Sequence, residues 1–219
     1  TVMANQGEVR IYTFGRDLFE DMLEDIANAH HRVLFETFIW KADEFGQRFK
    51  DALVAAADRG VEVYAVYDEF ANLVVPRTFF DFPESVNIQR HPLIGGPAFL
   101  DPRNSGRDHR KLLIIDAEIG YIGGYNIGDT YADRWRDTHA RLVGPAVAEL
   151  ENAFVDQWNQ KPLGLFRRND LGTPALVQAS ERSWQNGVVV HRNSPRIAVY
   201  PIRNMYLEAI DKATHHIWL

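Results

Sequence analysis

The stretch DHRKLLIID, residues 108–116, is the part of the chain from which the fold can best be argued. Residues 111–115 form a short apolar run rich in β-branched side chains, and residues 119–122 return to that character after a turn at 117–118. Two such runs joined by a short turn predict a strand, a tight turn and a second strand. We therefore expect a β-hairpin here and work outward from it.

Three polar side chains are expected to meet where this hairpin begins. Successive side chains of a strand point to opposite faces, so His109 and Lys111 share one face. The second strand leads through Gly123 and Gly124 to Asn126, which returns to the same end. Each residue alone is more often a solvated or packed group. Together, an imidazole, an ammonium and a carboxamide suit a phosphate ester.

The spacing of these residues is more specific than the residues themselves. The pattern H-x-K-x4-D-x6-G-G-x-N runs from His109 to Asn126 without a gap, and average residue usage gives it in fewer than about one chain per thousand. It resembles the phospholipase D superfamily, whose signature is H-x-K-x4-D-x6-G-[GS]-x-N. The flanking stretches DEFGQRFKDALVAAADRGVEVYAVYD (43–68) and WRDTHARLVGPAV (135–147) resemble its bacterial cardiolipin synthase branch more than its nuclease branch. The resemblance covers nearly the whole chain.

The resemblance implies a role for each residue of the pattern. His109 would attack phosphorus to give a phosphohistidine, while Lys111 and Asn126 hold the non-bridging oxygens. Asp137 matches the position of an acidic residue that keeps the nucleophilic imidazole neutral and in the correct tautomer; the alternative is a surface acid at a strand end. Asp116 lies at the far end of the strand, roughly 20 Å from the histidine if the chain is extended, and is implied to be structural.

Glycines and arginines complete the predicted site. Gly123 and Gly124 are expected to let the backbone approach the phosphate. Gly124 departs from the serine that is common in the superfamily, so a hydroxyl donor is lost. Arg103, Arg107 and Arg110 form a small basic patch beside the histidine. We interpret this patch as an anchor for an anionic headgroup, the alternative being loop charge.

Helical and strand periodicities alternate along the chain. This order predicts an α/β fold, an α-β-α sandwich with a mixed, mainly parallel sheet, in which residues 32–67 form a right-handed strand-helix-strand unit. Asp68 and Glu69 follow a buried strand and are either binding residues or solvated loop acids. The proline-rich stretch 70–108 is interpreted as part of a substrate channel wall. The expected helices are 17–31, 43–59 and 145–158, and the expected strands are 32–40, 61–67, 86–90 and 138–143.

The end of the chain resembles its beginning. LEAIDKATHHIWL (207–219) aligns without gaps on LEDIANAHHRVLF (23–35), which indicates either an internal duplication or two ordinary amphipathic helices. We expect residues 1–160 to be a phospholipase D-like N-terminal half, 161–186 a linker with a strand possible at 187–191, and 187–219 the beginning of a second half. No second H-x-K occurs, so the missing motif comes from a truncated C-terminal part or a homodimer partner, or the chain is inactive alone.

Composition narrows the function. The 219 residues are 46% hydrophobic and 25% charged, and they include no cysteine, which fits a reducing compartment. A net charge of −6 argues against nucleic acid as a partner. The sequence contains no run of about 18 apolar residues, the length that a membrane-spanning helix needs. The chain starts at Thr1 without an initiator Met, so the sequence leaves open whether an anchor precedes it.

These observations and the resemblance together lead to one prediction. We expect phosphatidyl transfer or phospholipid phosphodiester cleavage through a phosphohistidine, by a membrane-associated enzyme on the cytoplasmic side. The alternatives are a phosphodiesterase acting on nucleic acid and a non-catalytic lipid-binding domain. No cofactor and no metal is predicted, because the pairs His30-His31 and His215-His216 lack carboxylates at ligand spacing.

Overall fold

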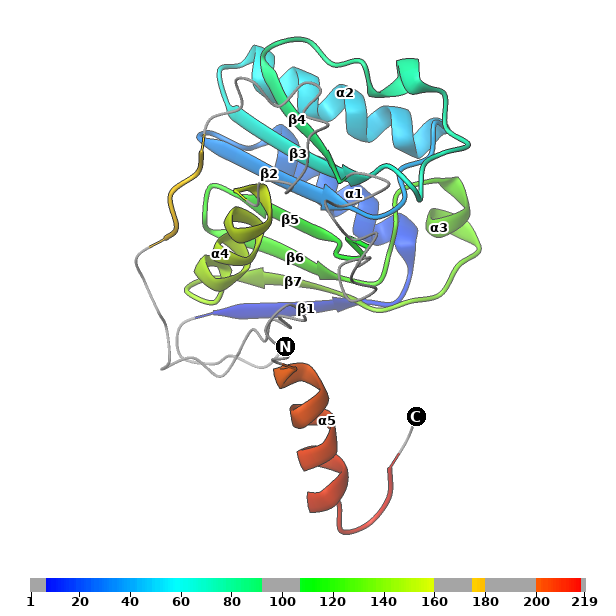
Figure 1. Ribbon diagram of the computed structural model, residues 1–219, viewed down its shortest axis with the longest axis vertical. Coiled ribbons are helices and arrows are strands. Elements are labelled where there is room, and N and C mark those ends of the chain that lie inside the picture. The colour runs from blue at the N-terminus through cyan, green and yellow to red at the C-terminus, as the bar shows by residue number, and fades with distance from the viewer. Residues whose placement is uncertain (1–6, 92–106, 160–174, 180–199, 218–219) are drawn as a thin grey trace, which may run out of the picture.

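The computed structural model describes residues 7–91, 107–159, 175–179 and 200–217. At its centre lies a mixed seven-stranded sheet with the order β1-β7-β6-β5-β2-β3-β4 (Figure 1). The strands are β1 Glu8–Tyr12, β2 Arg32–Thr37, β3 Glu62–Asp68, β4 Val86–His91, β5 Leu112–Ile115, β6 Ile119–Gly123 and β7 His139–Val143.

Helices cover both faces of the sheet, as the sequence predicted. The two long helices α1 and α2 lie behind the sheet in Figure 1, and α4 lies in front of it. Apolar residues of α1 and α2 form one core with the sheet, and those of α4 form a second core on the opposite face. The helices are α1 Gly15–Ala27, α2 Glu44–Asp58, the 3-10 turn η1 Arg77–Phe80, α3 Asp129–Asp133, α4 Val147–Trp158 and α5 Pro201–Lys212.

Strand pairing confirms a mixed sheet but corrects its expected proportions. The predicted strand-helix-strand unit is present, since β2 and β3 pair in parallel around α2, and β4 adds in parallel to β3. All other pairings, β1 with β7, β7 with β6, β6 with β5 and β5 with β2, are antiparallel. The expectation of mainly parallel pairing was therefore wrong. One of these pairings, β5 with β6, follows from the short turn between the two strands, because a connection of that length joins only antiparallel strands.

The strand directions place His109 and Asp116 at opposite ends of the sheet. β5 runs antiparallel to β2, with Leu112 opposite Glu36, so β5 begins where β2 and β3 finish. β1 and β6 also finish there, and β7 begins there. We call this the His109 end. The opposite end, where β5 turns into β6, is called the Asp116 end.

Three elements were not predicted, and one interpretation changes. β1, η1 and α3 escaped the sequence analysis. Phe79, Phe80 and Phe82, assigned to a channel wall, instead surround the fully buried Trp40, with ring centroids 5.8, 6.0 and 5.8 Å away. Aromatic rings that contact a buried ring edge-to-face or tilted at these distances belong to a core, so this part of 70–108 is structural.

The last part of the chain is described only in pieces. The predicted linker and the possible strand at 187–191 lie largely outside the described residues. α5 forms the helix expected within 207–219 but begins earlier, at Pro201, and has no buried residue. Residues 213–217 contain no strand.

Candidate active site

His109 and Lys111 are in direct contact at the His109 end. The Lys111 Nζ lies 3.0 Å from the His109 Nδ1 and donates a hydrogen bond to the His109 carbonyl oxygen at 2.6 Å. The Phe38 ring, just beyond β2, covers both groups, with its centroid 4.3 Å from the imidazole centroid and 5.2 Å from Nζ. An aromatic ring beside an ammonium stabilises its charge. Phe38 was not singled out in the sequence.

The environment sets useful protonation states for this pair. Burial, and after it the charge of Lys111, lowers the pKa of His109, against the opposing charges of Asp108 and Asp68. Burial lowers the pKa of Lys111 to about 8, although the carboxylates of Asp137 and Asp108 oppose that shift. Near neutral pH the imidazole is therefore mainly uncharged and the lysine mainly cationic. This combination of a nucleophile and a cation suits an anionic phosphodiester.

Asn126 is fixed beside the same segment. Its Oδ1 accepts a hydrogen bond from the Ile39 N–H at 3.1 Å, and its amide also bonds Tyr131, opposing the rise that burial causes in the Tyr131 pKa. Phe38 and Ile39 thus connect Asn126 with the covered histidine and lysine. The three residues predicted from the spacing lie around one short segment that follows β2.

Asp137 lies against Gly124, which explains why that position lacks a side chain. A Cβ on Gly124 would lie 2.1 to 2.4 Å from the carboxylate atoms of Asp137, and one on Gly123 would lie 2.5 Å from the His139 Cα. The Asp137 Oδ1 accepts from the Thr138 N–H at 2.8 Å. Its charge raises the pKa of Lys111 and of His139. Among the hydrogen bonds of the described residues, none joins Asp137 to the His109 ring.

His139 is a packed residue. It is 1% exposed, and both ring nitrogens lack a hydrogen-bond partner among the described residues. Burial lowers its pKa to about 3. Such a ring stays neutral at physiological pH, as expected of a side chain that packs in the interior.

Arg110 does not point toward an incoming headgroup. Its guanidinium forms an ion pair with the Glu36 carboxylate at 2.6 Å and donates to the Ala153 carbonyl at 2.7 Å. A longer contact of 3.5 Å reaches Asp108. The anchor role expected for Arg110 is thus corrected to an internal one, because a buried carboxylate requires a cationic partner. Arg103 lies outside the described residues, and Arg107 stacks on Phe70 at 4.3 Å.

Glu36 is an important residue that the sequence analysis missed. It is fully buried in β2, and burial followed by the charge of Asp108 raises its pKa well above the usual value, against the opposing charge of Arg110. One oxygen each of Glu36 and Asp108 has no hydrogen-bond partner among the described residues. An acid in an otherwise apolar strand was the available signal. Burial and the neighbouring Asp108 carboxylate therefore favour the neutral, protonated form of Glu36.

Asp68, the last residue of β3, and Glu69, which follows it, are not the solvated loop acids that the sequence left open as an alternative. Asp68 is fully buried, with Oδ1 accepting from the Ala71 N–H at 3.0 Å and Oδ2 from the Asp108 N–H at 3.3 Å. Glu69 forms an ion pair of 3.4 Å with Arg90. Asp68 therefore ties the end of β3 to the residue before the histidine.

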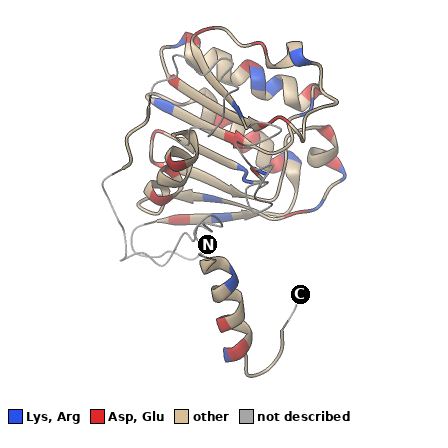
Figure 2. Cartoon of the chain, in the orientation of Figure 1, with Lys and Arg blue, Asp and Glu red and all other residues tan. Residues whose placement is uncertain are grey.

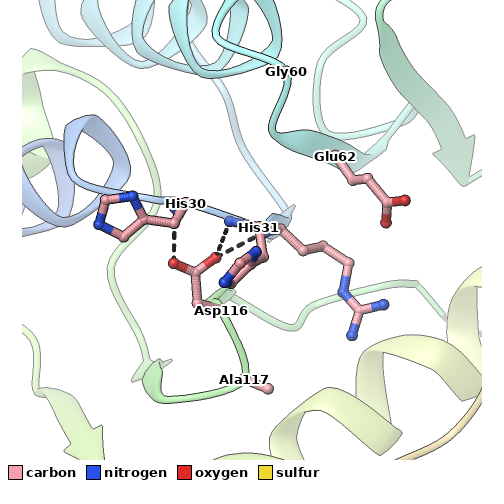
Figure 3. A pocket seen from close by; sticks show the side chains of 7 residues that line it. His30, His31, Gly60, Glu62, Asp116 and Ala117 are labelled. Carbon is pink, nitrogen blue, oxygen red and sulfur yellow. Dashed lines mark hydrogen bonds between the residues drawn. The ribbon is translucent and has the colours of Figure 1, made fainter.

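Asp116 lies at the other end and has structural contacts. Its carboxylate accepts from the backbone N–H groups of His30, His31 and Arg32 at 2.8, 2.7 and 2.8 Å (Figure 3). Burial alone would raise the Asp116 pKa, but these donors outweigh it and hold the pKa below its usual value. The surrounding hollow is also lined by Gly60, Glu62 and Ala117.

Charged side chains of both signs are interspersed over the part of the chain that the structure describes. Lys and Arg alternate with Asp and Glu over the described elements, without a continuous basic stripe in this view (Figure 2). Within residues 7–91, 107–159, 175–179 and 200–217, no three His, Asp or Glu side chains are placed to share a metal ion. No helix in those ranges is long and apolar enough to cross a bilayer.

The sequence is similar to those of known proteins. The family model described as "Cardiolipin synthase, PLD-like domain" matches residues 22–158, more than half of the chain. The chain is 38% identical over 168 residues to the major cardiolipin synthase ClsA of Bacillus subtilis, covering 73% of this chain and 34% of that protein. It is 30% identical over 221 residues to a cardiolipin synthase of a Geobacillus species, covering 97% and 43%. The chain thus spans less than half the length of these relatives.

Solved structures share the fold. Nuc from Salmonella typhimurium, a phospholipase D family member, aligns with a TM-score of 0.55 and 20% identity over 71% of this chain and 96% of its own. Phosphatidylserine synthase from Haemophilus influenzae aligns with a TM-score of 0.55 and 17% identity over 75% and 42%. At these identities the likeness concerns the fold alone.

Proposed function

Because the chain belongs to the family of cardiolipin synthase phospholipase D-like domains, we propose that it supplies one half of the active site of a phosphatidyl-transferring enzyme. The observation that carries this proposal is the contact between a mainly neutral His109 and a cationic Lys111, 3.0 Å apart, with Asn126 held by the adjoining segment. The relatives that are named cardiolipin synthases support the same reaction class.

In the proposed first step, an imidazole nitrogen of His109 attacks the phosphorus of a phospholipid. A P–N bond forms and the P–O bond to the leaving alcohol breaks, so the leaving oxygen needs a proton. In the structure, the Lys111 ammonium contacts the His109 Nδ1. In this step it donates instead to a non-bridging oxygen of the diester, where Asn126 provides a second donor. These groups stabilise the charge on the equatorial oxygens.

In the second step, an acceptor hydroxyl attacks the phosphohistidine. A P–O bond forms and the P–N bond breaks, which regenerates His109, while the acceptor's proton passes to the group of the second H-x-K motif that protonated the leaving alcohol. A glycerol-type hydroxyl gives transfer, and water gives hydrolysis. We keep Asp137 as the predicted acid that orients the imidazole. Its charge also raises the pKa of Lys111 and so favours the protonated lysine.

The leaving-group proton would come from a second H-x-K motif. We propose that α5 begins a second phospholipase D-like half, with residues 161–186 as the linker; a homodimer partner is the alternative source. Under the alignment of 207–219 on 23–35, Tyr206 and Ile210 correspond to Met22 and Ile26. The latter two are buried in α1, whereas their counterparts are 58% and 41% exposed in α5. An amphipathic helix with its apolar face uncovered is suited to pack on a further sheet.

Trapping of the intermediate tests this proposal. The full-length protein is mixed with phospholipid carrying a radiolabelled phosphate, then quenched in alkali, which preserves phosphohistidine, and the labelled peptide is mapped. We expect label at His109 and none in His109→Ala. His31→Ala, at the opposite end of the sheet, is the matched control and should keep the label. A wild-type enzyme that turns over without any label at His109 would contradict the proposed nucleophile.

The alternatives receive less support. A phosphodiesterase acting on nucleic acid is not favoured by the net charge of −6 or by the interspersed charges of the described elements. A lipid-binding domain without catalysis gives no reason for the pairing of His109 with a lysine whose pKa is lowered to about 8.

A further inference from the structure

Exposed apolar side chains in the loops of residues 7–159 gather at the His109 end of the sheet. Within the described residues of 7–159, five large apolar side chains are more than half exposed in loops, and each of these loops adjoins the His109 end. We call them the rim patch. They are Phe14 (53%), Phe70 (51%), Leu73 (58%), Val74 (81%) and Trp135 (51%).

Topology explains how distant segments form this patch. Phe14 directly follows β1, and Trp135 shortly precedes β7; the two strands pair with Tyr12 opposite His139. The segment 70–74 directly follows β3, which finishes at the same end of the sheet. The two parts of the patch therefore lie on the two sides of the strand that His109 precedes. The remaining exposed large apolar residues of this region are Ile11 in edge strand β1 and Ile122 in β6.

Arginines stack on the rings of both parts. The guanidinium of Arg107 lies 4.3 Å from the Phe70 centroid, and that of Arg136 lies 4.3 Å from the Phe14 centroid. Arg136 also donates to the Trp135 carbonyl at 3.2 Å, and within the described part of the chain it forms no ion pair. An arginine over an exposed ring places a cation at the level where an apolar side chain leaves the protein.

The Asp116 end provides an internal comparison. The residues that line its hollow are mostly polar or charged, among them His31, Glu62 and Asp116. Within the described residues of 7–159, no large apolar side chain of a loop at that end is exposed. Chance exposure would distribute single apolar residues over the surface. Their restriction to the end that carries the chemistry indicates a use connected with it.

We propose that the rim patch is the surface by which the enzyme docks onto an anionic phospholipid bilayer, with Leu73 and Val74 entering the acyl region and Arg107 and Arg136 at the level of the headgroup phosphates. This inference rests on the proposed function, since it explains how a diester embedded in a bilayer reaches His109. The net charge of −6 gives no general attraction to an anionic surface, so binding requires local cations combined with apolar side chains.

A second phospholipase D-like half is the other occupant to consider. The patch favours lipid, because its arginine-ring pairs complement an anionic and apolar boundary on both sides of the histidine. A protein interface built there would instead bury these arginines, and a buried cation requires an acidic partner on the second half. The two occupants predict different results in one experiment.

The test uses the full-length protein with the double variant Leu73→Ser, Val74→Ser. Flotation with vesicles of phosphatidylcholine mixed with phosphatidylglycerol should show an apparent Kd raised about tenfold to hundredfold, from the lost burial of two apolar side chains. Turnover is measured on the same vesicles and on a short-chain phospholipid below its micelle concentration. The ratio of vesicle to short-chain turnover should fall about tenfold. Val177→Ser, at an 83% exposed position outside the patch, is the matched control.

Three results would overturn the docking proposal. Equal vesicle binding by the double variant and Val177→Ser would remove the patch from the membrane surface. Equal loss of turnover on both substrates, with a lowered melting temperature, would assign the patch to an interface with the second half. The fluorescence of Trp135, obtained by comparison with Trp135→Phe, should be quenched by lipids that are brominated on their acyl chains. Fluorescence that these lipids leave unquenched would place the patch away from the bilayer. Vesicle binding that depends on the patch without turnover of either substrate would refute the proposed function alone.

Discussion

The two ends of the sheet use the same sequence motif in opposite ways. At the His109 end, a buried lysine contacts an imidazole, and the carboxylates of Asp137 and Asp108 act on its charge, so ionisable groups of both signs lie close together. At the Asp116 end, one carboxylate has three backbone donors. Only β5, four residues long, separates them. The difference teaches that a motif read as a unit in sequence divides in space into a reactive part and a stabilising part.

The largest expected effect comes from removing the cation. Lys111→Ala should lower the rate of phosphatidyl transfer by about a thousandfold, because loss of one stabilising group at a developing charge has that scale. The melting temperature should change little. Initial rates and thermal unfolding of the full-length protein measure both, and Lys111→Met preserves the apolar stem as a control. A loss of stability as large as that of an Asp116 variant would break the division between the two ends.

The converse is expected at the Asp116 end. Asp116→Ala should lower the free energy of unfolding by about 2–4 kcal/mol, since three backbone donors lose a charged acceptor. The rate per folded molecule should be retained. Denaturant unfolding gives the first quantity and active-site titration the second. Asp116→Asn, which keeps an acceptor and tolerates the observed φ of 53°, should lose less. A reduced rate in the folded fraction of Asp116→Ala would oppose this assignment.

The pH profile sharpens the comparison. As pH rises above the Lys111 pKa of about 8, the ammonium loses its proton, and kcat/KM should fall about tenfold per pH unit. Because the pKa of His109 is lowered, the imidazole stays neutral to a lower pH than a solvated histidine, and the acid limb should move down. A basic limb near the ordinary lysine value would contradict a buried cation.

The smallest effect is expected at Gly124. Gly124→Ala places a Cβ where the Asp137 carboxylate lies, so that carboxylate must move away from Lys111. We expect a loss of roughly tenfold in rate and a lower pKa for the basic limb, as for a weakened charge interaction. Asp137→Asn should behave alike, and the double variant should be no worse than either single one. Losses that add fully in the double variant would show that Gly124 and Asp137 act independently.

Local pattern was sufficient for part of this molecule. The hairpin, the helix that begins after the capping Asp43 and the assembly of His109, Lys111 and Asn126 at one end followed from periodicity and spacing. β1 did not, because EVRIY is a short edge strand with mostly exposed residues and gives little apolar alternation.

Long-range partners could not be predicted. Arg110 looked like a surface cation, and its partner Glu36 lies 74 residues earlier in the chain. Nothing near either residue encodes that pairing, which depends on β5 being placed beside β2. The contact between Gly124 and Asp137 arises similarly, from the return of β7 alongside β6. Spacing thus locates the reactive groups, whereas tertiary pairing determines which charges surround them.

The Glu36–Asp108–Arg110 cluster has a consequence for how the enzyme distinguishes charged from uncharged ligands. Burial and the charge of Asp108 favour the neutral form of Glu36, and the Arg110 guanidinium lies beside the Asp108 carboxylate, so the floor of the site carries little net charge. A neutral floor neither repels an incoming diester nor recruits a stray cation to the imidazole. The charge in direct contact with the imidazole is the ammonium of Lys111, so an anionic diester gains an attraction at this position that an uncharged ligand does not.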